Sequence, residues 1–258
     1  MFHALVAAFA ATRLNGGKVP KICFTSHNQT QLNARSRILR GLKHWRDADV
    51  VFSSRQQPDI NTARTVLIPN GVPVQTPPPA RQAWIEGGPV TLLAVGRLCA
   101  DKDPLGLIRS LAALNHPQVT LEFLGIGPLE AEARTLASAL GLQHRIRFSG
   151  LCTDVPARLR AADIFVMHSL DEGMPLALLE AGAAAMPVVS TPVGAIPDVL
   201  GRDRGWLTTA DRFANTLAQV IRQPDAAIAA GVRLHAHVCQ HHSIEAVTEQ
   251  HQRLYESV

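Results

Sequence analysis

Short apolar runs alternate with longer amphipathic segments through the second half of the chain. Apolar runs of this length, bounded by polar or glycine positions, are typical of buried parallel strands. They predict strands at 91–95, 120–124, 145–148, 164–167 and 188–190. The segments between them predict helices at 104–114, 128–140, 156–161 and 175–185. Strands that alternate with helices form a parallel, doubly wound sheet, so this half predicts an α/β domain.

Proline and glycine positions support these helix boundaries. A proline lies at or near the first turn of each predicted helix, where its missing N–H would have no partner in any case. Gly141 is placed to end the second helix. The tail from Ala210 to Val258 is also predicted to be helical, with breaks at Gln223-Pro224 and His241-His242-Ser243.

The first half of the chain contains fewer such units. The pattern predicts a helix over 2–14 and strands at 19–25, 49–54 and 66–72. The next residues, 73–89, are rich in proline and glycine, which is typical of a linker between domains. We therefore expect a partial domain over 1–73, a linker over 74–89, a second domain over 90–241 and a closing helix over 242–258.

Composition narrows the class of protein. With 258 residues, 47% of them hydrophobic, the chain can bury the cores of one or two domains. The net charge of +4 is modest and no aromatic residues interleave with a basic cluster, which argues against nucleic-acid binding. The four cysteines are far apart and fit a reducing, cytoplasmic location better than a disulfide framework. No apolar run approaches the ~20 residues of a membrane span.

Two segments of the first half admit alternatives. Residues 1–15 have the short apolar centre of a signal peptide, but they lack a basic start and run into a predicted strand, which favours a packed helix. Residues 31–46 are basic and amphipathic, with Ile38, Leu42 and Trp45 on one face. This segment either lies on an anionic membrane surface, at the inner face of the cytoplasmic membrane, or is a helix with a solvated face, which we favour.

The stretch from His168 to Asp198 places a helix start directly after a buried strand. An acidic turn, Asp171-Glu172-Gly173, follows the strand, and Pro175 is expected at the first helical position. The free N–H groups of that helix then lie at the carboxyl end of a strand. Open α/β sheets bind ligands there, and helix starts favour phosphate.

Two other patterns argue against cofactor or metal chemistry. The turn Gly125-Ile126-Gly127-Pro128 lacks the third glycine of a dinucleotide fingerprint and the acidic residue about 20 positions further on, so an NAD enzyme is not indicated. Near the end of the chain lies a group of metal-ligating residue types: His235, His237, Cys239, His241 and His242. Their spacing matches no zinc template, so solvated histidines are favoured over a metal site.

Basic residues follow the strand predicted at 91–95. Gly96-Arg97 comes directly after it, and Lys102 lies five positions beyond the arginine. Arginine can bind two oxygens of a diphosphate at once, whereas lysine supplies a movable point charge. Alone, such a pair is more often a surface feature at a strand end.

Together these motifs resemble a known enzyme family. Ser169, Glu172-Gly173, Glu180-Ala181 and Pro187-Val188-Val189 place two glutamates eight positions apart around the predicted helix. With Gly96-Arg97 and its lysine, this resembles the retaining GT-B glycosyltransferases of family 4, the glycosyl transferases group 1. The resemblance implies a GT-B-like α/β fold: a complete C-terminal Rossmann-type domain that binds the donor and a partial N-terminal domain on the acceptor side. It also implies that the closing helix returns to the N-terminal domain.

The resemblance implies roles for individual residues. Arg97 and Lys102 would stabilise the diphosphate that leaves as the glycosidic bond breaks. Glu172 would contact the donor-sugar hydroxyls or lie near the reacting face. Glu180 would accept hydrogen bonds from the ribose hydroxyls, the alternative being a helix-surface carboxylate. The remaining donor-binding candidates are Gly96, Gly173, Met174, Pro175 and Leu176, with Leu151 and Cys152 beside the base.

The first half of the chain adds one candidate for the donor-sugar site. The sequence also departs from the family pattern in two places. His27 ends a predicted strand where the family has a histidine near the donor sugar, and an exposed loop histidine is the equal alternative. His168 stands where proline usually precedes the serine. Family members also carry a further N-terminal segment, with a glycine-rich loop and much of the acceptor site, that this sequence lacks.

The implied activity is transfer of a sugar, such as a hexose, from a nucleotide diphosphate-sugar to a glycan or lipid-linked acceptor hydroxyl with retention of configuration. No metal, cofactor or protein nucleophile is implied, and the expected setting is bacterial surface polysaccharide or glycolipid synthesis. Two alternatives stay open. One is a non-catalytic donor-binding protein or subunit, and the other is a GT-B sugar-nucleotide epimerase, against which the combination of motifs argues.

Overall fold

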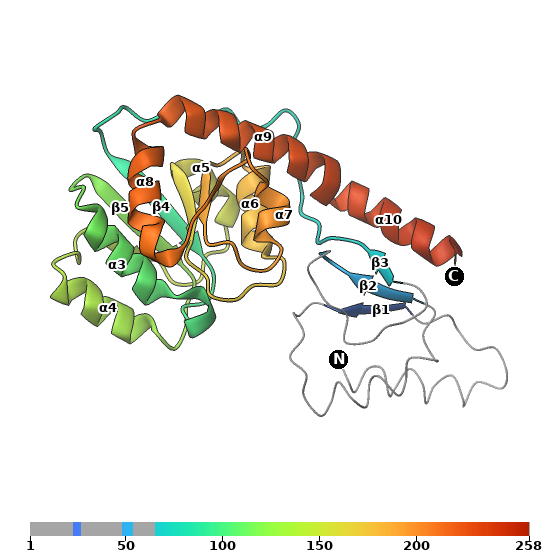
Figure 1. The fold of residues 1–258 in the computed structure, drawn as a ribbon, viewed down its shortest axis with the longest axis horizontal. Coiled ribbons are helices and arrows are strands. Elements are labelled where there is room, and N and C mark those ends of the chain that lie inside the picture. Colours follow the sequence, from blue (N-terminus) through green and yellow to red (C-terminus); the bar gives the residue numbers. More distant parts are fainter. Residues whose placement is uncertain (1–22, 27–47, 54–64, 258) are drawn as a thin grey trace.

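The structure is a computed structural model that describes residues 23–26, 48–53 and 65–257. It contains two parallel sheets, one of six strands and one of three, that lie side by side (Figure 1). The helix predicted over 2–14, His27 and the basic segment 31–46 lie outside the described residues.

The six-stranded sheet forms the larger part. Its strand order is β6-β5-β4-β7-β8-β9, and every neighbouring pair is parallel. The strands are β4 (Val90–Val95), β5 (Val119–Leu124), β6 (Ile146–Phe148), β7 (Ile164–Met167), β8 (Val188–Ser190) and β9 (Trp206–Leu207). The five predicted strands are confirmed within one residue, whereas β9, with two residues, was too short for a sequence pattern to indicate. The strand order reverses between β4 and β7, which makes their carboxyl ends the topological switch point.

Helices cover both faces of this sheet. One apolar core packs under α3 (Pro104–Leu114), α4 (Glu130–Ala139) and α8 (Phe213–Ile221). The other packs under α5 (Val155–Ala161), α6 (Leu176–Ala183), α7 (Ile196–Leu200) and α9 (Pro224–His242). Short 3-10 turns, η2 (Ala100–Lys102) and η3 (Ala210–Arg212), precede α3 and α8. The domain is therefore the three-layer α/β unit that the alternating pattern predicted.

Aspartates and prolines fix the starts of two of these helices. The Asp103 carboxylate accepts a hydrogen bond from Gly106 N at 2.9 Å, and Asp154 accepts one from Ala157 N at 2.9 Å. Each aspartate is followed by a proline in the first turn. The helix predicted over 175–185 is α6, which begins one residue later, at Leu176, because Pro175 has extended backbone at the N-cap, and ends at Ala183.

The smaller sheet joins β1 (Cys23–Ser26), β2 (Ala48–Val51) and β3 (Thr65–Leu67) in parallel order. The predicted strand over 66–72 was wrong beyond Leu67, where the chain continues toward the larger domain. A helix at the C-terminus, α10 (Ile244–Ser257), lies over this sheet (Figure 1). Its buried Leu254 joins an apolar cluster with Ala48, Val50 and Ile68.

Two chain segments cross between the sheets and bind each other. Val72 N donates to His242 O at 2.8 Å, and Ile244 N donates to Val72 O at 3.1 Å. These bonds pair the start of the linker with the break between α9 and α10. The two crossings are therefore joined to each other by backbone hydrogen bonds.

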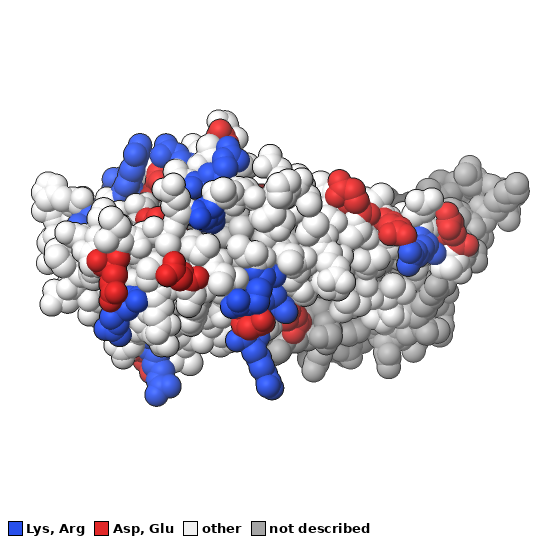
Figure 2. Space-filling view, turned by 90° about the horizontal axis from the view of Figure 1, so that it is seen from above, with Lys and Arg blue, Asp and Glu red and all other residues white. Residues whose placement is uncertain are grey.

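Charged side chains of both signs are scattered over the face seen in Figure 2, and wide uncharged areas separate them. Among the helices that the structure describes, none combines the length and apolar character needed to cross a membrane.

Candidate functional site

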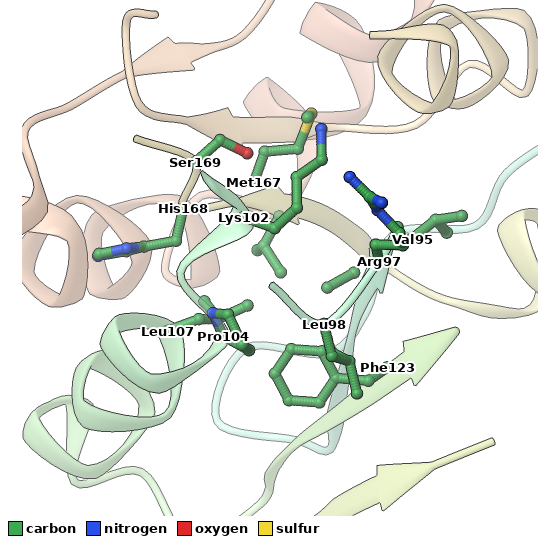
Figure 3. A pocket seen from close by; sticks show the side chains of 13 residues that line it. Val95, Arg97, Leu98, Lys102, Pro104, Leu107, Phe123, Met167, His168 and Ser169 are labelled. Carbon is green, nitrogen blue, oxygen red and sulfur yellow. The ribbon is translucent and has the colours of Figure 1, made fainter. Parts of the chain in front are cut away.

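The carboxyl ends of β4 and β7 form a pocket at the switch point. After β4 come Gly96 and Arg97, and Lys102 lies on the turn before α3. Across the pocket, His168 and Ser169 follow β7. The pocket is lined by Ala94, Val95, Gly96, Arg97, Leu98, Lys102, Pro104, Leu107, Phe123, Val166, Met167, His168 and Ser169. In Figure 3 the charged ends of Arg97 and Lys102 extend to the same side of it, so both cations of the predicted motif lie at one opening.

Glycines let the backbone turns of this edge pack closely. Gly96 and Gly125 have φ angles of 153° and 136°. A Cβ atom on Gly125 would clash with the Gly96 carbonyl oxygen, and one on Gly127 would clash with the Leu98 backbone. The turn after β5 therefore packs directly against the turn that carries Arg97 and supports it.

Glu172 is buried and paired within the protein. Only 7% of the residue is exposed. Its Oε1 atom accepts hydrogen bonds from Lys102 Nζ at 2.5 Å and from Ser169 Oγ at 2.8 Å. A buried carboxylate needs such partners, because an unpaired charge away from water is costly. The structure thus joins the expected phosphate-binding lysine to the expected sugar-binding glutamate.

Glu180 lies in a different environment. It is half-buried on α6 and faces a second pocket, between the linker residues Pro73–Gln75 and the α5 residues Pro156, Leu159 and Arg160. Among the described residues its carboxylate has no hydrogen-bond or ion-pair partner. Burial raises the pKa of Glu180. Glu172 and Glu180 therefore lie in separate parts of the molecule. Among the described residues, the charge of Glu172 is compensated by partners and that of Glu180 is not.

The other candidates surround the start of α6 or the neighbouring turns. Met174 is buried, and the Asn70 side chain donates to its carbonyl oxygen at 2.9 Å. Leu176 and Leu151 are exposed by 52% and 78%, and Cys152 is half-buried. Pro175 is buried and Gly173 is half-buried, with its carbonyl oxygen accepting from Ala195 N at 2.8 Å.

Two residues of this edge were not singled out as functional from the sequence. His168 was noted only as a departure from the family pattern, yet it is buried and bonded to Asp103. Asn70 ends the first domain in sequence, yet its amide holds the loop before α6. A polar residue replacing an expected proline was the one available signal for the first, and no sequence pattern pointed to the second.

The prediction that the C-terminal histidines are solvated was partly wrong. His235 and His242 are buried, and their ring nitrogens bond the carbonyl oxygens of Gln75 at 2.9 Å and Asn70 at 3.2 Å. The His237 ring lies 4.7 Å from the His241 ring and 5.5 Å from the His242 ring, tilted against both, and burial lowers its pKa to about 4. Within the described residues no three or more histidine, cysteine or acidic side chains are grouped to hold a metal ion.

Comparison with protein families and known proteins gives three results. Residues 80–231 match the family model "Glycosyl transferases group 1". The chain is 38% identical over 106 residues to the Vi polysaccharide biosynthesis protein VipC/TviE of Salmonella typhi, a match covering 40% of this chain and 18% of that protein. It is 34% identical over 142 residues to the putative colanic acid biosynthesis glycosyltransferase WcaL of Escherichia coli K12, covering 51% and 35%.

The solved structures agree on the fold. Anabaena Alr3699/HepE in complex with UDP superposes with a TM-score of 0.87 at 19% identity, over all of this chain and 77% of that one. Sucrose-phosphate synthase from Thermosynechococcus elongatus superposes with a TM-score of 0.82 at 21% identity, over 98% and 71%. The matches to the curated relatives named above span less than half of those proteins' own length.

Proposed function

The chain belongs to the glycosyl transferases group 1 family, and from this premise we propose that it transfers a sugar from a nucleotide diphosphate-sugar to an acceptor hydroxyl with retention of configuration. Its fold is that of the GT-B glycosyltransferases. The proposal places it among the retaining members of family 4. HepE was solved with UDP and with UDP-glucose, which supports a nucleotide-sugar donor for this chain as well.

The observation that carries the proposal is the cationic opening at the switch point. Arg97 and Lys102 line one pocket where β4 and β7 diverge, and ligands of open α/β sheets bind at this place. A departing diphosphate gains negative charge as the bond to the sugar breaks. Cations held in position stabilise that transition state more than the ground state.

Donor binding would exchange partners at Lys102. Without a ligand its ammonium group pairs with Glu172. A phosphate oxygen arriving beside Arg97 competes for the same ammonium group. Glu172, partly released, would then accept hydrogen bonds from hydroxyls of the donor sugar. The ion pair thus keeps both groups ready in the unliganded site and links diphosphate binding to sugar binding.

Glu180 is assigned to the ribose. A half-buried carboxylate that lacks a partner in the described part of the chain can accept two hydrogen bonds from a ribose diol. Leu151 and Cys152, on the turn after β6, are assigned to the base. The nucleotide would then extend from the Arg97 pocket along the start of α6 toward the linker.

The reaction follows from these assignments. The bond between the anomeric carbon and the phosphate oxygen breaks, and the electron pair stays on the phosphate facing Arg97 and Lys102. The acceptor oxygen forms its bond on the same face of the sugar, and the leaving phosphate takes the acceptor proton. The proposal includes no protein nucleophile and no metal, because the two side chains supply the positive charge. A sugar-nucleotide epimerase is not favoured, since the family is one of transferases.

We place the reaction in bacterial surface polysaccharide or glycolipid synthesis, with a glycan or lipid-linked acceptor. The names of the relatives support this setting. They include a putative colanic acid biosynthesis glycosyltransferase and a galactosyltransferase of E. coli whose name specifies a diphosphoundecaprenol-linked acceptor. A cytoplasmic location and contact of residues 31–46 with an anionic membrane stay predictions.

A binding screen tests the donor site directly. Calorimetric titration with UDP, GDP, ADP and their common sugar conjugates should select one nucleotide, and Arg97→Ala and Glu180→Ala should each weaken its binding at least tenfold. Arg109→Ala and Glu132→Ala, on exposed positions of α3 and α4, are matched controls that should bind as wild type. If no nucleotide binds, or if both site variants bind as tightly as the controls, the assignment is wrong.

A further inference from the structure

Two loops at the switch point are joined at three places. One is the turn that precedes α3 and carries Lys102, and the other is the loop that follows β7 and carries Glu172. Lys102 pairs with Glu172, the backbone N–H of Leu170 donates to Asp101 O at 2.7 Å, and the His168 ring bonds the Asp103 carboxylate. The third contact joins side chains 65 residues apart in the sequence and has no part in the proposed chemistry.

His168 is fully enclosed on the side away from the pocket opening. Only 3% of it is exposed. Its ring lies 4.8 Å from the Phe213 ring, and a Cβ atom on Gly106 would lie 2.6 Å from its Cε1 atom. Gly106 therefore leaves the space that the ring fills. Figure 3 shows the imidazole turned away from the side chains of Lys102 and Arg97, so His168 does not itself reach a ligand there.

The ring makes one hydrogen bond, through Nδ1. That atom lies 2.9 Å from Asp103 Oδ2, whereas Nε2 is buried without a protein partner among the described residues. A carboxylate only accepts, so Nδ1 carries the proton and donates. A single directed bond in a tight enclosure fixes the position of the carboxylate.

Asp103 transmits this position to the lysine next to it. Its backbone is left-handed, with φ 42° and ψ 58°, and its N–H closes the 3-10 turn on Ala100 O. One carboxylate oxygen caps α3 through Gly106 N, and the other accepts from His168. The strained residue is thus held from both sides directly after Lys102.

We propose that His168 is a positioning residue: through Asp103, it fixes where the ammonium group of Lys102 lies. The next residue, Ser169, holds the other member of the pair, because its hydroxyl donates to Glu172. Adjacent residues at the end of β7 therefore anchor the lysine side and the glutamate side separately. The consequence for the leaving diphosphate rests on the function proposed above, but the positioning of Lys102 against Glu172 does not.

The small number of lysines makes this positioning measurable without a substrate. The chain contains Lys18, Lys21, Lys43 and Lys102 only. Reductive methylation with ¹³C-formaldehyde therefore gives few dimethyl-lysine signals, and loss of one in Lys102→Arg assigns it. Glu172→Gln defines where the Lys102 signal lies when the pair is broken.

Two substitutions of His168 separate positioning from space filling. His168→Asn keeps an N–H donor near the place of Nδ1, and the Lys102 signal should stay at its wild-type position. His168→Leu fills the space without a donor, and the signal should move toward its position in Glu172→Gln. Asp103→Gly, which accepts left-handed backbone and is a tolerated N-cap, removes the acceptor of the His168 ring and should move the signal in the same direction if the leucine variant does not fold. A wild-type signal in both His168→Leu and Asp103→Gly, or a displaced signal in His168→Asn, would overturn the proposal.

Turnover adds a second measurement once a donor is known. His168→Leu should lower kcat about tenfold or more with a smaller change in KM for the donor, and His168→Asn should restore most of it. The two proposals then fail separately. An unmoved Lys102 signal refutes the positioning role, whereas a moved signal in a protein that binds no nucleotide refutes only the proposed function.

Discussion

The two glutamates of the motif, Glu172 in the loop before α6 and Glu180 within α6, differ in how their charge is compensated inside the protein. Glu172 is buried, and its carboxylate is compensated by Lys102 and Ser169. Glu180 is half-buried with no compensating partner among the described residues, and burial raises its pKa. A half-buried carboxylate that faces a pocket without a partner among the described residues is available to a ligand. We therefore expect Glu172 to contribute to stability and, under the proposed function, Glu180 to contribute to donor binding.

The largest expected effect comes from removing the partner of Glu172. Lys102→Ala should lower turnover about 100-fold or more, because the leaving diphosphate loses one of two cations. It should also cost about 2 kcal/mol of unfolding free energy, because Glu172 stays buried with only Ser169 as partner. Release of nucleoside diphosphate from the selected donor and urea denaturation measure the two effects.

A second substitution separates the effect of Lys102→Ala on turnover from its effect on stability. Lys102→Ala with Glu172→Gln should regain most of the stability, since the glutamine is uncharged, and none of the turnover. If Lys102→Ala is as stable as wild type, the ion pair does not compensate Glu172 and the contrast between the glutamates is lost.

The next effect tests whether the loop of Glu172 depends on its backbone support. Gly194 has φ 57°, and a Cβ atom there would clash with the carbonyl oxygens of Glu172 and Gly173. Gly194→Ala should therefore cost about 3 kcal/mol and lower turnover, because this backbone cannot move without moving Glu172. Urea denaturation measures the loss of stability, and release of nucleoside diphosphate from the donor measures the loss of turnover.

Gly87 offers a matched control for that substitution. It also has a left-handed backbone, with φ 75°, but a Cβ atom there would meet nothing within 4 Å. Gly87→Ala should cost only about 1 kcal/mol, the price of the backbone conformation alone, and should leave turnover unchanged. Equal losses in the two variants would show that the crowding beside Glu172 has no effect.

On the other side of the comparison, Glu180→Gln should weaken donor binding about tenfold without loss of stability. The amide keeps the shape but gives up the charge that strengthens bonds from the ribose hydroxyls. Calorimetry with the selected nucleotide measures the affinity, and urea denaturation measures the free energy of unfolding. Glu132→Gln, on the exposed face of α4, is the control. A destabilised Glu180→Gln protein with wild-type affinity would reverse the roles of the two glutamates.

Sequence patterns predicted the structure formed by neighbouring residues and missed the contacts between residues far apart in the chain. Strands, helices and the aspartate–proline helix starts follow from neighbouring residues, and Arg97 and Lys102 were found at a strand end. The bond between Lys102 and Glu172 joins residues 70 positions apart. Glu180 faces the linker residues Pro73–Gln75, which precede the first strand of the domain in the sequence. Such pairings depend on strand order, which a periodic pattern does not contain. His168 is the instructive case, because its replacement of proline was visible but its partner Asp103 was not.

The smallest effect is a pH dependence that belongs to Glu180 alone. Burial raises its pKa above the ordinary 4.5, so the folded protein binds that proton more tightly than the unfolded chain does. The stability that this contributes is present at low pH and is lost as pH rises through the raised folded pKa. Glutamine has no such loss.

The unfolding free energy of Glu180→Gln relative to wild type should therefore increase as pH rises from the ordinary carboxyl pKa of 4.5 through the raised pKa of Glu180, and then level off, as measured by urea denaturation at a series of pH values. Asp163, whose pKa burial also raises, is common to both proteins, so its contribution cancels in the difference. The ligand should counter this trend, because a ribose diol bound to the ionised carboxylate stabilises the wild type more than the variant. A difference that stays constant with pH would mean that Glu180 is as well solvated as an ordinary surface carboxylate, and the argument that it is reserved for a ligand would fail.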